Sequence, residues 1–236
     1  MKYIISIFLY LVGSISFLIL GTSIIACSYL FKPRQYDKFA KLLCRIFLKT
    51  FFIKIEVIGS DKIDPEKTYV FMSNHVNIFD VFILYGYIPN FARGVELDSH
   101  FNWPIWGATI RRFGNIPISQ TNTRSALKSL SHAEQAIHNG TSIIILPEGH
   151  RTKNDQLLRF MKGPFILAQK TKADIVPTAM VRAFQIKRVT HWLVRPGKMK
   201  FVFGDVIPYD SYKNKTPNEL RDIVKNTIQQ LIDNNR

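Results

Sequence analysis

The longest hydrophobic feature of the chain is an uncharged stretch at its N-terminus. Residues Tyr3 to Phe31 form 29 consecutive positions without Asp, Glu, Lys, Arg or His. A helix of this length would extend about 43 Å, which exceeds the hydrocarbon core of a bilayer. Core helices of soluble proteins seldom run so far without a charge. The pattern predicts a membrane-anchoring helix that either spans the bilayer with a tilt or lies partly in the interface.

A second helix is predicted between Gln35 and Thr50, and its surface is divided between apolar and basic side chains. The apolar ones recur at spacings of three and four: Phe39, Leu42, Leu43, Ile46 and Phe47. Much of the remaining surface is basic: Lys38, Lys41, Arg45 and Lys49. This pattern suits a helix at an anionic membrane interface and also a packing helix with a solvated face. Both are possible at once if the helix packs on the domain near the lipid, so residues 1–50 are interpreted as an anchor.

Residues 51–236 alternate strand and helix patterns. Short runs rich in β-branched or aromatic residues predict strands at Phe51–Ile58, Thr68–Met72, Ser142–Leu146, Ile175–Val181 and Met199–Val206. Helical spacing predicts helices at Val81–Tyr87, Ser125–His138 and after the capping box Thr216–Glu219. We therefore expect one α/β domain, a mixed and mostly parallel sheet flanked by helices, behind the N-terminal membrane-anchoring helix pair.

The excess of basic residues indicates the kind of partner that the protein binds. Lys and Arg number 32 against 17 Asp and Glu, so the formal net charge is +15, which implies a polyanion such as nucleic acid or an anionic membrane surface. A basic cluster directly follows the uncharged stretch, and such clusters stay on the cytoplasmic side of a membrane. The sequence has no helix-turn-helix, zinc-finger or RNA-binding aromatic signature, so we expect no nucleic acid partner. We expect the domain at the cytoplasmic face of a membrane.

An exported protein is the alternative for the N-terminal stretch. Ile24 to Cys27 has the form of a lipoprotein cleavage box, and Lys2 supplies one n-region charge. The uncharged stretch is longer than the 7–15 residues or so of a signal-peptide core, and strongly basic residues follow it. Both features favour a retained anchor.

The first candidate for chemistry is the segment from Asn74 to Asp80, which directly follows a predicted strand. His75 and Asp80 are five residues apart, and on a continuous helix they would lie about 140° apart and could not meet. Contact requires a turn that places Asp80 at the start of the next helix, where it could accept the Nδ1 hydrogen of His75 and raise its basicity. The simpler interpretation is an Asp that caps a helix beside a hydrogen-bonded His.

The second candidate follows another buried strand. Residues 143–146 run into Pro147-Glu148-Gly149-His150-Arg151, which combines a carboxylate, a glycine and a guanidinium. Ligands of open α/β sheets bind at the carboxyl ends of strands, glycine permits close backbone approach, and Arg can hold a phosphate through two hydrogen bonds. Taken alone, the loop could equally be a turn with a surface ion pair.

Missing motifs narrow the chemistry further. The sequence has no G-x-S-x-G nucleophile elbow and no P-loop. Cys27 lies in the apolar stretch and Cys44 in the basic helix, which are poor places for a thiolate. His132 and His138 are six apart on a helix and do not share a face as metal ligands would, so no metal site is predicted. A His base without a protein nucleophile suits direct attack by a substrate hydroxyl on an activated acyl group.

These segments together resemble the glycerolipid acyltransferases typified by 1-acyl-sn-glycerol-3-phosphate acyltransferase. Asn74-His75 with Asp80 resembles the first motif of that family, and Pro147–Arg151 resembles the third. Residues 114–118 stand where the second motif is expected and residues 175–179 resemble the fourth. Phe160-Met161-Lys162-Gly163 also resembles the basic segment after the third motif. The similarity spans residues 51 to 205, and an N-terminal anchoring helix pair is common in the family.

The resemblance implies the glycerolipid acyltransferase fold and a specific reaction. His75 would be the general base on an acceptor hydroxyl, oriented by Asp80. Acyl-CoA or acyl-carrier protein would donate the acyl group, with no cofactor or metal. The acceptor would be a lysophospholipid, foremost 1-acyl-sn-glycerol-3-phosphate, giving phosphatidic acid. The residues expected to bind substrate are Asn74, Glu148, Gly149, Arg151, Arg124, Arg112 and Lys162.

One departure from the family pattern concerns the acceptor. Many members have Asp-Arg after the second motif, where this chain has Ser119-Gln120. Glutamine keeps hydrogen bonding but loses the charge and the planar fork. Either Arg124 or Arg112 substitutes for the missing arginine, or the acceptor is a different lysolipid. A catalytically silent membrane protein that binds anionic lipid is a further alternative.

Overall fold

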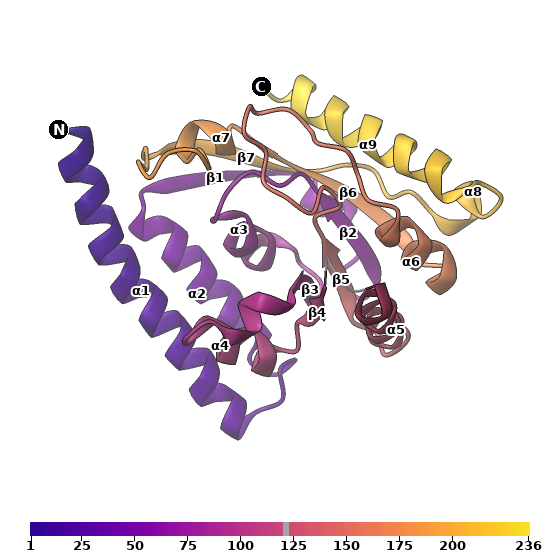
Figure 1. Ribbon diagram of the computed structural model, residues 1–236, viewed down its shortest axis with the longest axis horizontal. Coiled ribbons are helices and arrows are strands. Elements are labelled where there is room, and N and C mark those ends of the chain that lie inside the picture. The colour runs from indigo at the N-terminus through magenta and orange to yellow at the C-terminus, as the bar shows by residue number, and fades with distance from the viewer. Residues whose placement is uncertain (120–122) are drawn as a thin grey trace.

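The computed structural model describes residues 1–119 and 123–236, and the side chains of residues 123–127 are also outside its description. Both N-terminal helices are present. Helix α1 spans Lys2–Leu30 and α2 spans Asp37–Thr50. Figure 1 shows α1 along one edge of the molecule with α2 beside it. Along the described residues, α1 is the one helix long and apolar enough to cross a membrane.

The centre of the fold is a seven-stranded sheet in the order β1-β7-β6-β2-β5-β3-β4. Its strands are β1 Ile53–Ile58, β2 Tyr69–Ser73, β3 Ala92–Leu97, β4 Ile116–Ile118, β5 Ser142–Ile145, β6 Asp174–Val181 and β7 Gly197–Phe203. Strand β6 pairs antiparallel with β7, and the other pairs are parallel. The predicted mixed, mostly parallel sheet is confirmed.

Helices cover both faces of this sheet (Figure 1). One face carries α1 and α2 with α3 Asp80–Tyr87 and α4 Trp106–Phe113. The other carries α5 Thr123–His138, α6 Gly163–Thr171 and α9 Pro217–Asn234. Two short helices, α7 Ala183–Ile186 and α8 Tyr209–Tyr212, flank β7.

Strand β2 divides its side chains between two hydrophobic cores. Phe71 packs in the core beneath α1, α2 and α3, whereas Val70 and Met72 pack in the core beneath α5, α6 and α9. Alternate residues of a strand point to opposite faces, so a central strand covered on both sides has no polar face. This burial explains why β2 appears in the sequence as an unbroken apolar run. It also fixes the position of the polar residues that follow the strand.

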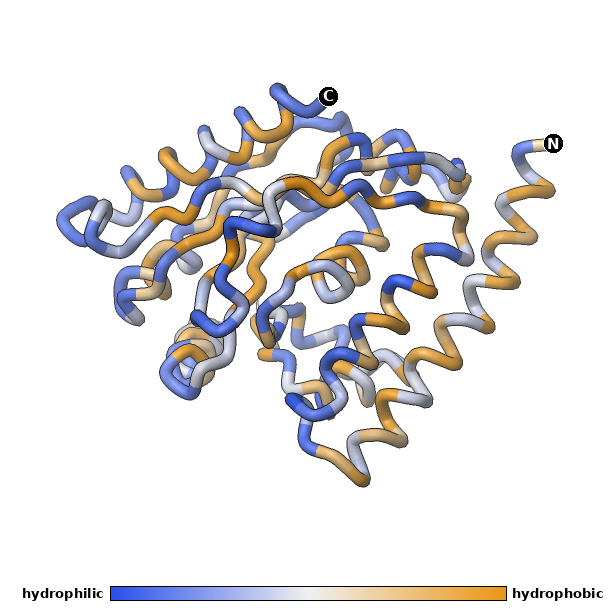
Figure 2. Tube along the Cα trace, turned by 180° about the vertical axis from the view of Figure 1, so that it is seen from behind, coloured by the Kyte–Doolittle hydropathy of each residue, from blue (hydrophilic) through white to orange (hydrophobic). Residues whose placement is uncertain are grey.

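Helix α1 packs on the domain along most of its length. A Cβ atom on Gly13 would overlap the ring of Phe51, and one on Gly21 would lie 2.6 Å from Ile105. The two glycines therefore let the helix backbone approach the domain closely. The opposite side of α1 is apolar and exposed, and Figure 2 shows the helix as a largely hydrophobic element at the edge of the molecule.

Candidate active site

The turn between β2 and α3 brings His75 and Asp80 together. Asp80 is the first residue of α3, and its Oδ2 lies 2.7 Å from Nδ1 of His75. The same oxygen accepts hydrogen bonds from the backbone N–H groups of Val76 and Asn77, at 2.6 and 3.0 Å. This contact confirms the turn geometry expected from the sequence. Because a carboxylate only accepts, Nδ1 of His75 carries the hydrogen and Nε2 keeps a free lone pair.

The buried amides of Asn74 and Asn77 hold this turn against the end of β6. Asn74 donates to the carbonyl oxygen of Met180 at 3.0 Å and accepts from its N–H at 2.7 Å. Asn77 donates to the carbonyl of Ala183 at 2.9 Å. Sequence reasoning placed Asn74 among the substrate-binding residues; the residue is 5% exposed, and its amide is hydrogen-bonded to the backbone of Met180. The structure shows this amide joining the turn that carries His75 to the end of β6, and Asn77, which the sequence reasoning did not single out, makes a second such contact with Ala183.

Glu148 braces the same turn from the neighbouring strand. It follows β5, which pairs with β2, and one carboxylate oxygen accepts from the N–H of His75 at 2.7 Å. The other accepts from the N–H of Leu158, also at 2.7 Å. Glu148 is buried, which raises its pKa above the usual value although the two hydrogen bonds lower it. Both oxygens thus accept from backbone amides, and the side chain joins the His75 turn to the loop after β5.

The rest of this loop supplies a glycine and cations. Gly149 has a φ of +69°, a conformation that side-chain-bearing residues rarely adopt. Three residues on, Thr152 donates its N–H to the carbonyl of His75 at 2.9 Å, which places Arg151 beside the turn. Lys162 is exposed at the N-terminus of α6. Arg151 and Lys162 are therefore the predicted cations that this loop carries.

Lys187 is a further cation near Arg151 that the sequence reasoning missed. Burial lowers the pKa of Lys187, and the positive charge of Arg151 lowers it further. Its ammonium donates to the carbonyl oxygens of Arg188 and His191. Lys187 follows α7, whose first residue contacts the His75 turn through Asn77. Nothing in the local sequence distinguishes it from the many other lysines, because only the chain crossing at α7 brings it near the loop.

Of the other two arginines predicted to bind substrate, the structure describes the side chain of Arg112 alone. Arg112 donates to the hydroxyl oxygens of Tyr29 at 2.7 Å and Ser28 at 3.3 Å, and its guanidinium lies 4.1 Å from the centre of the Tyr29 ring. It therefore ties α4 to the end of α1. The side chain of Arg124 lies outside the described residues, as does Gln120.

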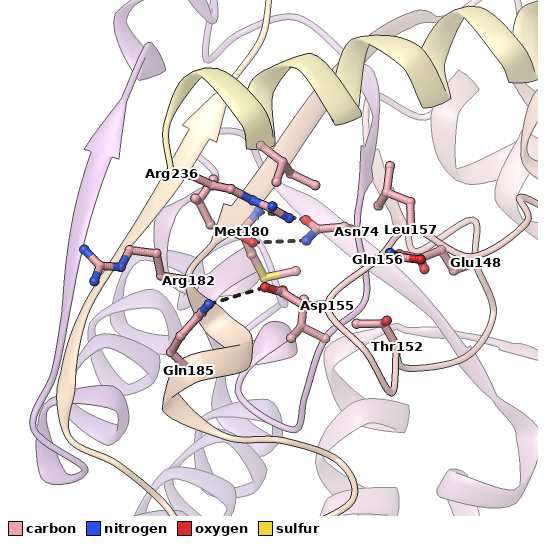
Figure 3. Close-up of a pocket in the computed structure, with 13 residues that line it drawn as sticks. Asn74, Glu148, Thr152, Asp155, Gln156, Leu157, Met180, Arg182, Gln185 and Arg236 are labelled. Carbon is pink, nitrogen blue, oxygen red and sulfur yellow. Dashed lines mark hydrogen bonds between the residues drawn. The ribbon is translucent and has the colours of Figure 1, made fainter.

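A small cavity lies behind the turn, between the loop after β5, the end of β6 and the end of α9 (Figure 3). Asn74, Glu148 and Thr152 line it, and Gln185 of α7 donates to Asp155 of the loop at 3.3 Å. This last hydrogen bond joins α7 directly to the loop. The loop after β5 and helix α7 therefore contact each other, and both also contact the turn that carries His75.

Cys44 is unsuited to nucleophilic chemistry. Cys44 is buried within α2, and burial raises the pKa of its thiol to about 12. A thiol is nucleophilic only as the thiolate, so Cys44 is inert at neutral pH. The reactive arrangement at this site is thus a His with a free Nε2, backed by a carboxylate and flanked by cations.

Comparison with known proteins identifies relatives of this chain. The Acyltransferase family model matches residues 54–181. A 1-acyl-sn-glycerol-3-phosphate acyltransferase of Pseudomonas aeruginosa is 27% identical over 193 residues, covering 81% of this chain and 73% of that protein. The chloroplastic 1-acyl-sn-glycerol-3-phosphate acyltransferase LPAT1 of Arabidopsis thaliana is 30% identical over 156 residues, covering 64% and 43%. The chain spans about half the length of the algal and chloroplastic relatives it matches.

The fold has a solved counterpart. The crystal structure of the 1-acyl-sn-glycerophosphate acyltransferase PlsC from Thermotoga maritima superposes with a TM-score of 0.83. The superposition covers 99% of this chain and 95% of that one, at 18% sequence identity. The whole chain, including the N-terminal helices, therefore shares this fold.

Proposed function

Since the chain belongs to the Acyltransferase family, we propose that it moves a fatty acyl group from a thioester donor to the hydroxyl of a lysophospholipid. The observation that carries this proposal is the 2.7 Å contact between His75 and Asp80, which leaves Nε2 of His75 able to take a proton. The favoured acceptor is 1-acyl-sn-glycerol-3-phosphate, the substrate named for the relatives, and the product would be phosphatidic acid.

The reaction follows from this geometry. Nε2 of His75 takes the proton of the acceptor hydroxyl as its oxygen attacks the thioester carbonyl, and Asp80 stabilises the imidazolium that forms. The tetrahedral intermediate then collapses, the carbon–sulfur bond breaks, and the leaving thiolate takes the proton back from His75. The products are an ester and a thiol, with no net change in the protein. The donor would be acyl-CoA or acyl-carrier protein.

We assign the anionic head group of the acceptor to Arg151 and Lys162. Arg151 adjoins Thr152, which is hydrogen-bonded to His75, and a guanidinium can grip a phosphate through two parallel hydrogen bonds. Glu148 and Asn74 act indirectly, because Glu148 accepts from the N–H groups of His75 and Leu158 and Asn74 bonds to the backbone of Met180. Gly149 supplies the left-handed turn that the loop needs between them.

A small apolar cavity beneath the anchor helices marks the place where we propose that an acyl chain inserts between them. Helices α1, α2, α3 and α4 each contribute to its lining, which includes Leu20, Cys44, Phe82 and Ile110. Helix α3 starts at Asp80, so the cavity lies under the helix that carries the catalytic carboxylate. An apolar lining with few polar groups suits a hydrocarbon chain.

We propose that α1 and α2 hold the domain on the cytoplasmic face of a membrane, with α1 lying in the interface. The packing of Gly13 and Gly21 against the domain supports an in-plane helix, because a spanning α1 would carry its partners into the hydrocarbon. Exposed apolar residues also occur on α2, where Phe39, Leu42 and Ile46 are 42 to 50% exposed. The basic residues beside them suit anionic lipid.

A product assay tests the activity. The purified protein is incubated with a panel of lysolipids that differ in head group, each with acyl-CoA and with acyl-carrier protein, and products are identified by mass spectrometry. We expect a diacyl product, most from lysophosphatidic acid. A different preferred lysolipid would support the altered acceptor site that Gln120 suggests. Absence of any acylated product from all acceptors and both donors would refute the proposed function.

A further inference from the structure

The segment from Lys187 to Pro196, between α7 and β7, exposes apolar side chains beside the start of α1. Trp192 is 48% exposed and Val189 is 39% exposed. The indole of Trp192 lies 6.0 Å from the ring of Tyr3 and 6.4 Å from that of Tyr10, measured between ring centres. We call residues 187–196 the Trp192 segment. Its aromatic surface joins that of α1 although the two are far apart in the sequence.

Hydrogen bonds fix the Trp192 segment to α1. The hydroxyl of Tyr10 donates to the carbonyl of Trp192 at 2.6 Å. The hydroxyl of Ser6, which is fully buried, donates to the carbonyl of Val194 at 3.3 Å and accepts from its N–H at 3.2 Å. The placement of Trp192 beside α1 is therefore set by backbone contacts as well as by ring packing.

The surface around Trp192 combines exposed apolar residues with cations. The neighbouring exposed apolar residues of α1 are Tyr3, Ile4, Ile7, Phe8, Leu11 and Ile15, between 53 and 72% exposed. Exposed cations beside them along the chain are Lys2, Arg188, Arg195 and Lys198. Indole rings with an apolar body and a polar edge, next to basic side chains, are typical of the boundary between lipid tails and head groups.

From this continuity we propose that the Trp192 segment is a second membrane contact, which inserts Trp192 among the head groups of anionic phospholipids beside α1. The inference rests on the proposed membrane location and goes beyond it by assigning a contact outside the two N-terminal helices. A second copy of the chain is the other conceivable occupant. Two copies would bring the same cations together, whereas an anionic lipid surface complements them.

The proposed contact has a consequence for the site. Helix α7 directly precedes the Trp192 segment, and its Gln185 donates a hydrogen bond to Asp155 of the loop after β5 at 3.3 Å. A membrane contact at Trp192 would therefore place that loop near the head-group layer, where a lysolipid acceptor resides. The segment would set the tilt of the domain so that the acceptor reaches His75 from the bilayer.

Fluorescence quenching by brominated lipid tests the proposal in the whole chain. Wild type and Trp192→Phe are mixed with vesicles of phosphatidylglycerol and phosphatidylcholine with or without bromine on the acyl chains. Their difference isolates Trp192 from Trp103 and Trp106. We expect bromine to reduce the Trp192 contribution by about half or more, because the indole lies within the interface. Ile15→Trp in the Trp192→Phe background reports whether α1 is in the membrane.

The outcomes separate the inference from the proposed function. Quenching of the indole introduced by Ile15→Trp, without quenching of Trp192 in the wild type, would overturn the inference while membrane association stands. A Trp192 emission that is already blue-shifted without vesicles, and more so at higher protein concentration, would indicate a second copy and overturn it as well. Product formation is measured separately, so an inactive protein with quenched Trp192 would contradict only the proposed function.

A kinetic readout examines the consequence for the site. Trp192→Ala is expected to raise the apparent KM for a vesicle-embedded acceptor about fivefold, because part of the interfacial contact is lost. The kcat for an acceptor dispersed in detergent should stay unchanged. Leu193→Ala, a half-buried neighbour in the same segment, is the matched control. Equal KM values for both variants and the wild type would contradict the role of Trp192 in presenting the acceptor.

Discussion

At the scale of single residues, the site separates a reactive group from the groups that position it. His75 has one nitrogen hydrogen-bonded to Asp80 and the other free, whereas Asn74, Asn77 and Glu148 bond to backbone groups that join the His75 turn to neighbouring segments. Substitutions at these two kinds of residue should therefore affect different kinetic constants. Residues that place His75 should affect kcat, and cations that hold the acceptor should affect KM.

Glu148 and Arg151 provide the clearest contrast. Glu148→Gln replaces an oxygen that accepts from an N–H with an amide group that donates, so we expect kcat to fall about tenfold or more and stability to fall by about 1–3 kcal/mol. Arg151→Ala should instead raise KM for an anionic acceptor about tenfold or more, by loss of charge-assisted hydrogen bonds. Steady-state kinetics and urea unfolding check both. The same KM effect in both variants would show that Glu148 contacts the acceptor after all.

The raised pKa of Glu148 predicts the direction in which the free energy of unfolding changes with pH. Burial favours the protonated form, so the contribution of this titration to stability is fully present below the unfolded pKa and is lost as pH rises through the raised folded pKa. The loss of free energy of unfolding caused by Glu148→Gln should therefore be larger at pH 4 than at pH 7. Urea unfolding of both proteins across this range measures the difference. A cost that grows with pH would contradict a buried, raised-pKa carboxyl.

Sequence reasoning found His75 and Asp80 as a pair but not the tasks of their neighbours. The required turn could be derived because a helix cannot bring residues five apart together. The bonds from Asn74 to Met180, however, join residues 106 apart, and Arg112 meets Tyr29 across 83. Such contacts depend on the order of strands in the sheet and on the docking of α1, neither of which a local pattern contains.

At the scale of elements, the strands with an apolar or alternating pattern were predictable, and β3 and β4 at one end of the sheet were not. β2, β5 and β6 are apolar runs that begin and end near the predicted positions. β3 contains Arg93, Gly94 and Glu96, and β4 is three residues long with a proline, so neither shows a strand pattern. Arg93 is buried in β3, where its guanidinium stacks on Phe91 and Phe113. Tertiary contacts decide the structure there.

The glycines of α1 give an element-scale prediction. Gly13→Val would place side-chain atoms within the ring of Phe51, so we expect α1 to loosen from the domain at a cost of about 1–3 kcal/mol. Limited proteolysis and thermal unfolding of the detergent-solubilised protein measure this. Ile15→Val, two residues away on the exposed side, is the matched control and should behave as wild type. Equal behaviour of both variants would contradict the tight docking of α1.

The cavity beneath the anchor helices gives a second prediction at the scale of elements. Cys44→Phe would fill part of the space, so we expect a shift of preference toward shorter acyl chains. Competition between a medium-chain and a long-chain donor, analysed by mass spectrometry of the products, measures this ratio. Leu42→Phe on the half-exposed side of the same helix serves as the control. An unchanged chain-length ratio in Cys44→Phe, with the protein folded, would remove the acyl chain from this cavity.

At the scale of the whole molecule, the net charge of +15 and the exposed apolar face of α1 both fit the proposed contact with an anionic lipid surface. The electrostatic part should weaken as salt rises, because the screening length falls from about 10 Å at 0.1 M to about 3 Å at 1 M. Vesicle flotation is expected to show partial release at high salt, with the apolar contacts of α1 retaining the rest. Complete release at about 1 M salt would contradict insertion of α1.

The central claim is acyl transfer through His75. Its most direct test is the rate of diacyl product formation from lysophosphatidic acid by wild type and by His75→Ala, in the same vesicles and followed by mass spectrometry. We predict a loss of about 10²–10⁴-fold, the share of a general base, with unchanged thermal unfolding and vesicle binding. Product formed by folded His75→Ala at the wild-type rate would contradict the role of His75 as the general base.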